Sequence, residues 1–276
     1  MSDRYAVIGN PIAHSKSPQI HAAFALQTGQ DVEYSRLLAP VDGFRAAVAE
    51  FRAGGGRGLN VTLPFKLEAF DIADEVSQRA RDACAANFLS FAPGIIRADN
   101  TDGSGLVTDL AANLGVKLEG RRVLLLGAGG AAQGVLGPLL ARRPAILAIA
   151  NRSADKALRL AENLRHQPGA AHTVVSGHGY GDLAGHHFDL VINATSSSLQ
   201  GEVPPLPAGI FAPESLAYDM MYGSDPTPFL VFAQARGVAR VADGLGMLVE
   251  QAAESFFLWR GVRPRTAPVI QLLRGR

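Results

Sequence analysis

The stretch from Val123 to Ala132, with the sequence VLLLGAGGAA, is the strongest indication of fold in the chain. Four consecutive aliphatic residues before a turn are typical of a buried strand, and helix-forming residues follow the glycines. Gly127 and Gly129 are separated by one residue, and Ala132 lies three positions after the second glycine. This is the spacing of the dinucleotide fingerprint, which accepts alanine at the third place because alanine still allows the helix to pack closely on the strand.

The glycine turn suits a phosphate-bearing ligand. Glycine lets the backbone approach a pyrophosphate closely, and the N-terminus of the following helix presents amides and the positive end of its dipole. The candidate cofactor-binding residues of the turn are Gly127, Ala128, Gly129, Gly130 and Ala131. Because an ordinary strand-to-helix connection can have the same sequence, the flanking segments must support the interpretation.

Apolar runs recur downstream of the turn at the spacing of a doubly wound α/β sheet. Strands are expected at residues 145–150, 173–176, 190–193 and 216–219, with a possible sixth at 239–242. Thr195 follows the strand at 190–193, at the kind of strand end where open sheets bind ligands, although turn-forming residues would have the same pattern. We expect residues 106–244 to form a Rossmann-like dinucleotide-binding domain.

The residues after the second strand of this domain bear on the choice of dinucleotide. An NAD-specific protein usually presents Asp or Glu there to the hydroxyls of the adenine ribose. This chain has Asn151, Arg152 and Ser153 instead, and Lys156 follows one helical turn later. Arg152 and Lys156 form a cationic pair suited to the extra phosphate of NADP, although most arginines and lysines are simply solvated. The pattern favours NADP over NAD.

The N-terminal part of the chain also alternates strands and helices. Strands are expected at residues 5–8, 32–38 and 58–63, and helices at 18–26, capped by Ser17, and at 41–53. This alternation favours parallel pairing and an α/β domain. We expect residues 1–105 to form this domain, completed by residues 245–276, whose long apolar helix at 247–259 would return to it.

The composition favours a globular chain and argues against several classes of partner. Of 276 residues, 47% are hydrophobic and 18% charged, which is typical of a packed protein of two domains. With a formal net charge of +1 and no long run of one sign, neither nucleic acid nor a membrane is expected as a partner. The lone Cys84 fits a reducing compartment, so a cytoplasmic location is expected. The histidines lack metal-site spacing, and no metal is expected.

Five segments together resemble one enzyme family. They are Ser15-Lys16-Ser17-Pro18, NVTLPFK at residues 60–66, NTDG at 100–103, the glycine turn with Asn151-Arg152, and DGLGMLVEQ at 243–251. In this order they resemble the shikimate dehydrogenase family, which includes quinate dehydrogenases. The resemblance implies a two-domain fold with the active site in the cleft and reversible reduction of 3-dehydroshikimate by NADPH, in aromatic amino-acid biosynthesis. It also implies that Lys66 and Asp102 are the catalytic pair.

The same two residues make chemical sense. Reduction of a ketone needs a hydride at carbon and a proton at oxygen, so an acid must lie within hydrogen-bond reach of that oxygen. Lys66 can be that acid, and Asp102 can orient its ammonium group. Taken singly, Lys66 would be a surface lysine that begins a helix after Pro64, and Asp102 a turn residue before Gly103.

The resemblance implies further contacts. A polyhydroxylated carboxylate needs short neutral donors and amides around it, and the matching positions are Ser15, Ser17, Thr62, Asn87, Tyr222 and Gln251. Ser15 and Ser17 would hold the carboxylate. Met220, Gly244 and Met247 would lie on the nicotinamide side, although a methionine is equally a core residue.

Two positions depart from the family pattern and leave other functions open. Phe88 stands where the family usually has threonine, and Gln78 where many members have an acidic residue. One alternative is therefore a paralogue that acts on quinate or an aminated shikimate relative with NAD or NADP. Another is a non-catalytic dinucleotide-binding sensor. A monomer or a homodimer is expected.

Overall fold

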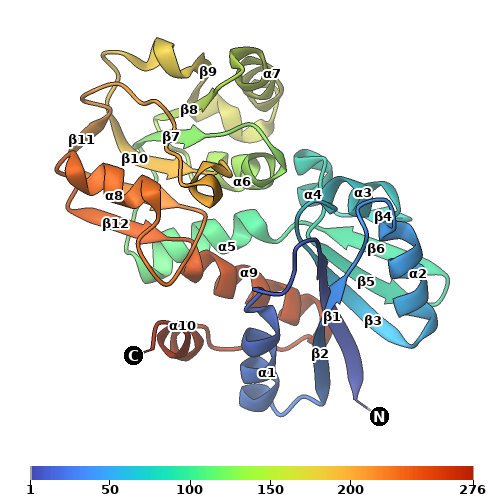
Figure 1. The fold of residues 1–276 in the computed structure, drawn as a ribbon. Coiled ribbons are helices and arrows are strands. Elements are labelled where there is room, and N and C mark those ends of the chain that lie inside the picture. Colours follow the sequence, from blue (N-terminus) through green and yellow to red (C-terminus); the bar gives the residue numbers. More distant parts are fainter. Residues whose placement is uncertain (1, 276) are drawn as a thin grey trace. The chain divides into compact units, whose positions relative to one another are not determined.

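A computed structural model describes residues 2–275 of the chain, which divide into two compact units. The first unit contains the chain up to residue 105 together with the segment from residue 248 onward, and the second unit contains residues 106–247. The chain therefore passes from the first unit to the second and back. Figure 1 shows the order of the elements within each unit.

The second unit contains a six-stranded sheet in which every neighbouring pair is parallel. Its strands lie in the order β12-β11-β10-β7-β8-β9. They are β7 (Arg122–Leu126), β8 (Ile146–Asn151), β9 (Val174–Gly179), β10 (Phe188–Asn193), β11 (Phe211–Asp219) and β12 (Arg240–Asp243). The order reverses between β7 and β10, where doubly wound sheets bind ligands outside the carboxyl ends of the strands. The Rossmann-like fold predicted from the glycine turn is confirmed.

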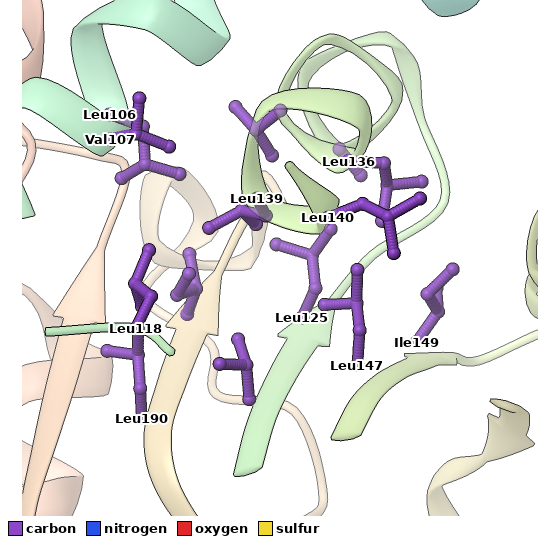
Figure 2. Close-up of a cluster of buried hydrophobic side chains, with 14 of the residues drawn as sticks. Leu106, Val107, Leu118, Leu125, Leu136, Leu139, Leu140, Leu147, Ile149 and Leu190 are labelled. Carbon is purple, nitrogen blue, oxygen red and sulfur yellow. The ribbon is translucent and has the colours of Figure 1, made fainter. Parts of the chain in front are cut away.

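Strand β7 is buried on both faces of the sheet. Leu125 belongs to one buried cluster, whereas its neighbours Leu124 and Leu126 belong to another. Figure 2 shows the first cluster, in which Leu125 of β7 lies near Leu139 of the helix α6. Because side chains alternate along a strand, an unbroken apolar run indicates helices on both faces. The α-helices that lie wholly in this unit are α6 (Gly130–Leu140), α7 (Ala154–Arg165) and α8 (Pro228–Ala235), with 3-10 turns at Pro168–His172, Tyr180–Leu183 and Ser197–Gln200.

The first unit contains a second six-stranded sheet, in the order β2-β1-β3-β5-β6-β4. Its strands are β1 (Asp3–Gly9), β2 (Val32–Leu38), β3 (Gly56–Val61), β4 (Glu75–Val76), β5 (Phe88–Ala92) and β6 (Ile95–Asp99). β1 is parallel to β2 and β3, as expected, but β5 is antiparallel to both β3 and β6. Only Pro93 and Gly94 connect β5 to β6, and so short a connection forces antiparallel pairing. The predicted parallel pairing is therefore confirmed for β1, β2 and β3, whereas the antiparallel strand β5 was not predicted.

Helices of the first unit bring distant segments together. Those that lie wholly in this unit are α1 (Ser17–Thr28), α2 (Phe44–Ala53), α3 (Lys66–Asp71), α4 (Gln78–Ala83) and α10 (Ala267–Leu273). The chain enters the second unit within α5 (Asp102–Thr108), which a π-helix at Asp109–Asn113 continues, and it returns to the first unit within α9 (Leu245–Arg260). Phe256 of α9 packs with Ile20 and Phe24 of α1, so the predicted return of the C-terminal helix is confirmed. Ser17 is the first residue of α1 rather than its predicted cap, which is Lys16.

Candidate active site

Lys66 and Asp102 meet within the first unit. Each is the first residue of a helix, Lys66 of α3 and Asp102 of α5. The ammonium Nζ of Lys66 donates to Oδ2 of Asp102 at 2.5 Å, and the two side chains are only 17% and 9% exposed. Burial of an ion pair costs free energy unless the remaining polar atoms are also hydrogen-bonded. The stability of the buried pair therefore depends on whether the other oxygen of Asp102 is also hydrogen-bonded.

Asn87 donates a hydrogen bond to that second oxygen, Oδ1 of Asp102. Its side-chain amide donates to Oδ1 of Asp102 at 2.8 Å, and its own Oδ1 accepts the backbone N–H of Thr101 at 2.7 Å. The backbone amide of Asp102 donates to the side chain of Asn100 at 3.1 Å. Each oxygen of the Asp102 carboxylate thus accepts a hydrogen bond from a different side chain, Lys66 or Asn87. These two hydrogen bonds fix the orientation of the carboxylate.

Helix α9 completes the arrangement from the far end of the chain. Oε1 of Gln251 accepts from Asn87 and from the hydroxyl of Thr101, both at 3.3 Å. The hydroxyl of Ser255 lies 3.2 Å from that of Thr101 and accepts from the side-chain amide of Asn60 at 2.9 Å. We call the connected set the polar hub, which consists of Asn60, Lys66, Asn87, Thr101, Asp102, Gln251 and Ser255.

Three members of the polar hub were not among the predicted site residues. Asn60 and Thr101 lie inside the motifs NVTLPFK and NTDG, so their positions were indicated although no role was assigned to them. Ser255 lies beyond the last motif, and its contact with Asn60 spans 195 residues of sequence. No local pattern could have indicated that contact.

The remaining predicted substrate residues of the first unit lie at the carboxyl ends of its strands. The loop after β1 carries Ser15, whose hydroxyl donates to that of Ser17 at 3.2 Å and accepts the N–H of Ser17 at 3.3 Å. Thr62 follows β3 and packs so closely on Gly9 that a Cβ at Gly9 would lie 2.5 Å from its methyl group. Among the described hydrogen bonds, none joins these three side chains to Lys66 or Asp102.

The second unit carries the predicted cofactor residues, beginning with the glycine turn. Gly127 follows β7 with a φ of 113°, and an added Cβ would lie 3.1 Å from the carbonyl oxygen of Ala194. Both facts favour glycine there. At Gly129 and Gly130 an added Cβ would meet no atom within 4 Å, and Gly130 begins α6. Ala128 completes the turn, and Ala131 lies in the first turn of α6.

The predicted phosphate-reading residues lie at the next strand end. Asn151 is the last residue of β8 and donates to the carbonyl of Ser153, which precedes α7, at 3.1 Å. Arg152 and Lys156 are both exposed. No carboxylate in the described residues forms an ion pair with either cation. Two uncompensated positive charges therefore lie beside one strand end.

Other predicted residues gather where β10, β11 and β12 end. The hydroxyl and amide of Thr195 both donate to the side chain of Asn193, at 2.7 and 3.1 Å. Met220 directly follows β11, and an added Cβ at Gly244 would lie 2.2 Å from its carbonyl oxygen, so only glycine fits there. Met247 is 7% exposed and belongs to the hydrophobic core of this unit. Tyr222 lies in the second unit, after β11.

Comparison with known proteins identifies the family. Models described as shikimate dehydrogenase substrate binding domain, shikimate/quinate 5-dehydrogenase and shikimate 5'-dehydrogenase C-terminal domain match residues 7–89, 109–200 and 244–274. The shikimate dehydrogenase (NADP(+)) of Nitrosospira multiformis is 62% identical over 274 residues, which cover 99% of this chain and 98% of that protein. The chain belongs to the shikimate dehydrogenase family.

Solved structures of similar proteins agree. An Ael1 enzyme from Pseudomonas putida is 52% identical and superposes with a TM-score of 0.90, covering 99% of this chain and 98% of the other. The shikimate 5-dehydrogenase of Thermus thermophilus, solved in complex with NADP(H) and shikimate, is 32% identical with a TM-score of 0.86 and 99% coverage of both chains. The resemblance inferred from five short motifs thus extends over nearly the whole chain.

The side chains of Phe88 and Gln78, which depart from the shikimate dehydrogenase pattern, have partners other than Lys66 and Asp102. The ring of Phe88 is 4% exposed and stacks on that of Trp259, with centroids 5.0 Å apart. Gln78 is exposed on α4 and donates to Asp82 at 2.7 Å. Phe88 is therefore part of an aromatic core, and Gln78 is part of the outer surface of a helix.

Residues 2–275 contain no cluster of three or more His, Cys, Asp or Glu side chains that could hold a metal ion. None of their helices is both long enough and apolar enough to cross a membrane.

Proposed function

We propose that this chain catalyses the NADP-dependent, reversible reduction of 3-dehydroshikimate to shikimate in aromatic amino-acid biosynthesis. The observation that carries the proposal is the contact of Lys66 with Asp102, whose second oxygen is held by Asn87. The family and its NADP-dependent relatives support the choice of substrate and cofactor. The cationic pair Arg152 and Lys156 gives an independent reason for NADP.

Proton transfer is the part of the reaction that this pair can perform. When bound, the reduced nicotinamide supplies the hydride to the ketone carbon. The ammonium group of Lys66 donates a proton to the ketone oxygen, and in the reverse direction the neutral amine accepts the proton of the alcohol. Asp102 keeps the ammonium group oriented and stabilises its charge. Asn87 keeps the carboxylate from turning away.

The substrate and cofactor residues are assigned by the same proposal. Ser15 and Ser17 bind the carboxylate of shikimate, and its hydroxyl groups bind to neutral side chains. The proposed partners of the hydroxyl groups are Thr62, Asn87 and Gln251 of the first unit and Tyr222 of the second. The glycine turn takes the pyrophosphate, and the proposed nicotinamide contacts are Thr195, Met220, Gly244 and Met247.

A substrate and cofactor matrix tests the proposal. Purified protein is assayed with shikimate and with quinate, each with NADP⁺ and with NAD⁺. We expect the highest kcat/KM for shikimate with NADP⁺. A higher value for quinate would support the paralogue, which the buried ring of Phe88 does not favour. Absence of turnover with all four pairs, together with measurable NADP⁺ binding, would support the sensor.

The oligomeric state and the cytoplasmic location remain predictions. Light scattering coupled to size-exclusion chromatography distinguishes a monomer from a homodimer. Fractionation of the source cells tests the location.

A further inference from the structure

The loop that carries Ser15 and Ser17 is attached to the neighbouring strand by one arginine. Arg36 of β2 donates from Nε and from Nη2 to the same backbone carbonyl, that of Ser15, at 3.0 and 2.6 Å. Two donors of a planar guanidinium on one oxygen restrict both the position and the direction of that carbonyl. The loop is thereby fixed by a residue that lies 21 positions further along the chain.

The charge of Arg36 has no counter-ion among the residues that the structure describes. The side chain is exposed, and within residues 2–275 no carboxylate forms an ion pair with it. By contrast, Arg57 of β3, on the other side of β1, is paired with Asp3 at 3.3 Å. A full positive charge therefore lies beside the loop of Ser15 and Ser17, in addition to the charge of Lys16 within that loop. An anion bound to that loop would be attracted by this charge, and the attraction would weaken as salt is added.

The strand β2 contributes a second side chain on the same face. Tyr34 lies two residues before Arg36, so their side chains point to the same side of the strand. The hydroxyl of Tyr34 donates to Oδ1 of Asn60, a member of the polar hub, at 2.8 Å. One face of β2 thus contacts both the serine loop and the polar hub.

We propose that Arg36 is a positioning and specificity-determining residue. It fixes the loop of Ser15 and Ser17, and its uncompensated charge favours substrates that carry a carboxylate over neutral alcohols and ketones of the same shape. This inference rests on the proposed function, because it concerns the carboxylate end of the same substrate.

Three variants separate the two contributions of Arg36. Arg36→Gln removes the charge, Arg36→Lys keeps the charge but removes the planar fork, and Arg45→Gln is the matched control. Arg45 is an exposed arginine of α2 without an ion pair among the described residues. KM and kcat are measured for shikimate and for its neutral methyl ester, at low and at high salt, together with the Kd of NADP⁺ from fluorescence.

For Arg36→Gln we expect KM for shikimate to rise about five- to tenfold at low salt, with kcat and the Kd of NADP⁺ little changed. KM for the methyl ester should rise less, and the salt dependence of KM for shikimate should weaken, with only the charges of Lys16 and Lys66 remaining near the loop and the pair. Arg36→Lys should keep the salt dependence while KM rises for both substrates. Arg45→Gln should match the wild type.

Equal increases in KM for acid and ester in Arg36→Gln would overturn the inference, and so would an unchanged salt dependence. Inactivity of the wild type toward shikimate would instead contradict the proposed function. Thermal unfolding of each variant reports whether the fold is intact, and a normal Kd for NADP⁺ confirms that the second unit is unaffected.

Discussion

The polar hub of the first unit and the glycine turn of the second are built in opposite ways. In the polar hub, Asp102 is nearly buried and each of its oxygens has a protein donor. At the glycine turn, Gly129 and Gly130 have no atom within 4 Å of an added Cβ, and the nearby Arg152 is exposed and without an ion pair. The reacting groups are therefore oriented by the protein itself, whereas the cofactor residues present backbone and charge to a ligand.

This contrast predicts different consequences of substitution. Removal of one member of a preorganised pair should affect the chemical step, because the remaining groups lose their orientation. Removal of the exposed charge at Arg152, or a side chain that keeps the cofactor away from the backbone of the glycine turn, should weaken cofactor binding and leave the chemical step intact. The following predictions test the contrast, from the largest expected effect to the smallest.

Lys66→Ala should have the largest effect. Loss of the proton donor is expected to lower kcat by about 10²- to 10⁴-fold, since general acid–base catalysis contributes on that scale. The Kd of NADP⁺, measured by fluorescence, should remain within about twofold of the wild type. Lys156→Ala is the matched control with the opposite pattern, weaker NADP⁺ binding and normal kcat. An unchanged kcat in Lys66→Ala would exclude the proposed role of Lys66.

The first unit should also be sensitive to acid through His21. This side chain is buried and stacks on Tyr34 with ring centroids 4.1 Å apart, and burial lowers the pKa of His21 to about 3. The unfolded chain binds the proton near pH 6.5, so the free energy of unfolding should fall from that pH down to about 3.

At pH 5 this loss should be about 2 kcal/mol relative to pH 7 in the wild type. His21→Phe should reduce the loss, because phenylalanine binds no proton. Urea unfolding at the two pH values measures the difference. If the wild type and the variant lost the same stability, His21 would not be the group responsible.

Arg152→Gln should weaken the binding of NADP⁺ by about tenfold, as expected for one charge-assisted contact. The Kd of NAD⁺ should stay the same, because NAD⁺ lacks the additional phosphate. Titration of both dinucleotides into the variant distinguishes the outcomes. Equal weakening of the two would show that Arg152 does not recognise that phosphate.

Two glycine substitutions should differ in kind, and Gly129→Ala should have the smallest effect of all. Gly129→Ala introduces a methyl group without a neighbour within 4 Å, so the melting temperature should be unchanged while NADP⁺ binding weakens by severalfold. Gly244→Ala would place its Cβ 2.2 Å from the carbonyl of Met220 and should lower the stability by about 1 to 3 kcal/mol. Normal NADP⁺ binding by Gly129→Ala would contradict the proposed pyrophosphate site.

The same contrast explains what the sequence could predict. The sequence around Gly127 is local, because the apolar strand, the turn and the helix are consecutive, and the parallel sheet of the second unit followed from it. In the first unit, β4, β5 and β6 were not predicted. Phe88 and Leu89 of β5 contact Trp259 of the helix α9, which is distant in sequence. Because the partner is distant, the residues next to β5 in the sequence carry no periodic pattern that would reveal the strand.

The polar hub was only partly predictable for the same reason. Lys66, Asp102, Asn87 and Gln251 were taken from the family motifs, and the structure brings them together in one hydrogen-bonded set. The roles of Ser255 and Arg36 depend on pairings across 195 and 21 residues. Such pairings exist only once the strands and helices are assembled.

A double-mutant cycle between Lys66 and Asp102 tests the central claim most directly. Values of kcat are measured for Lys66→Ala, Asp102→Asn and the double variant, with the melting temperature of each as a check on folding. If the two side chains act as one proton-transferring unit, the double variant should be about as slow as Lys66→Ala alone. If the two losses multiply, the side chains act independently, and the proposed catalytic pair does not exist.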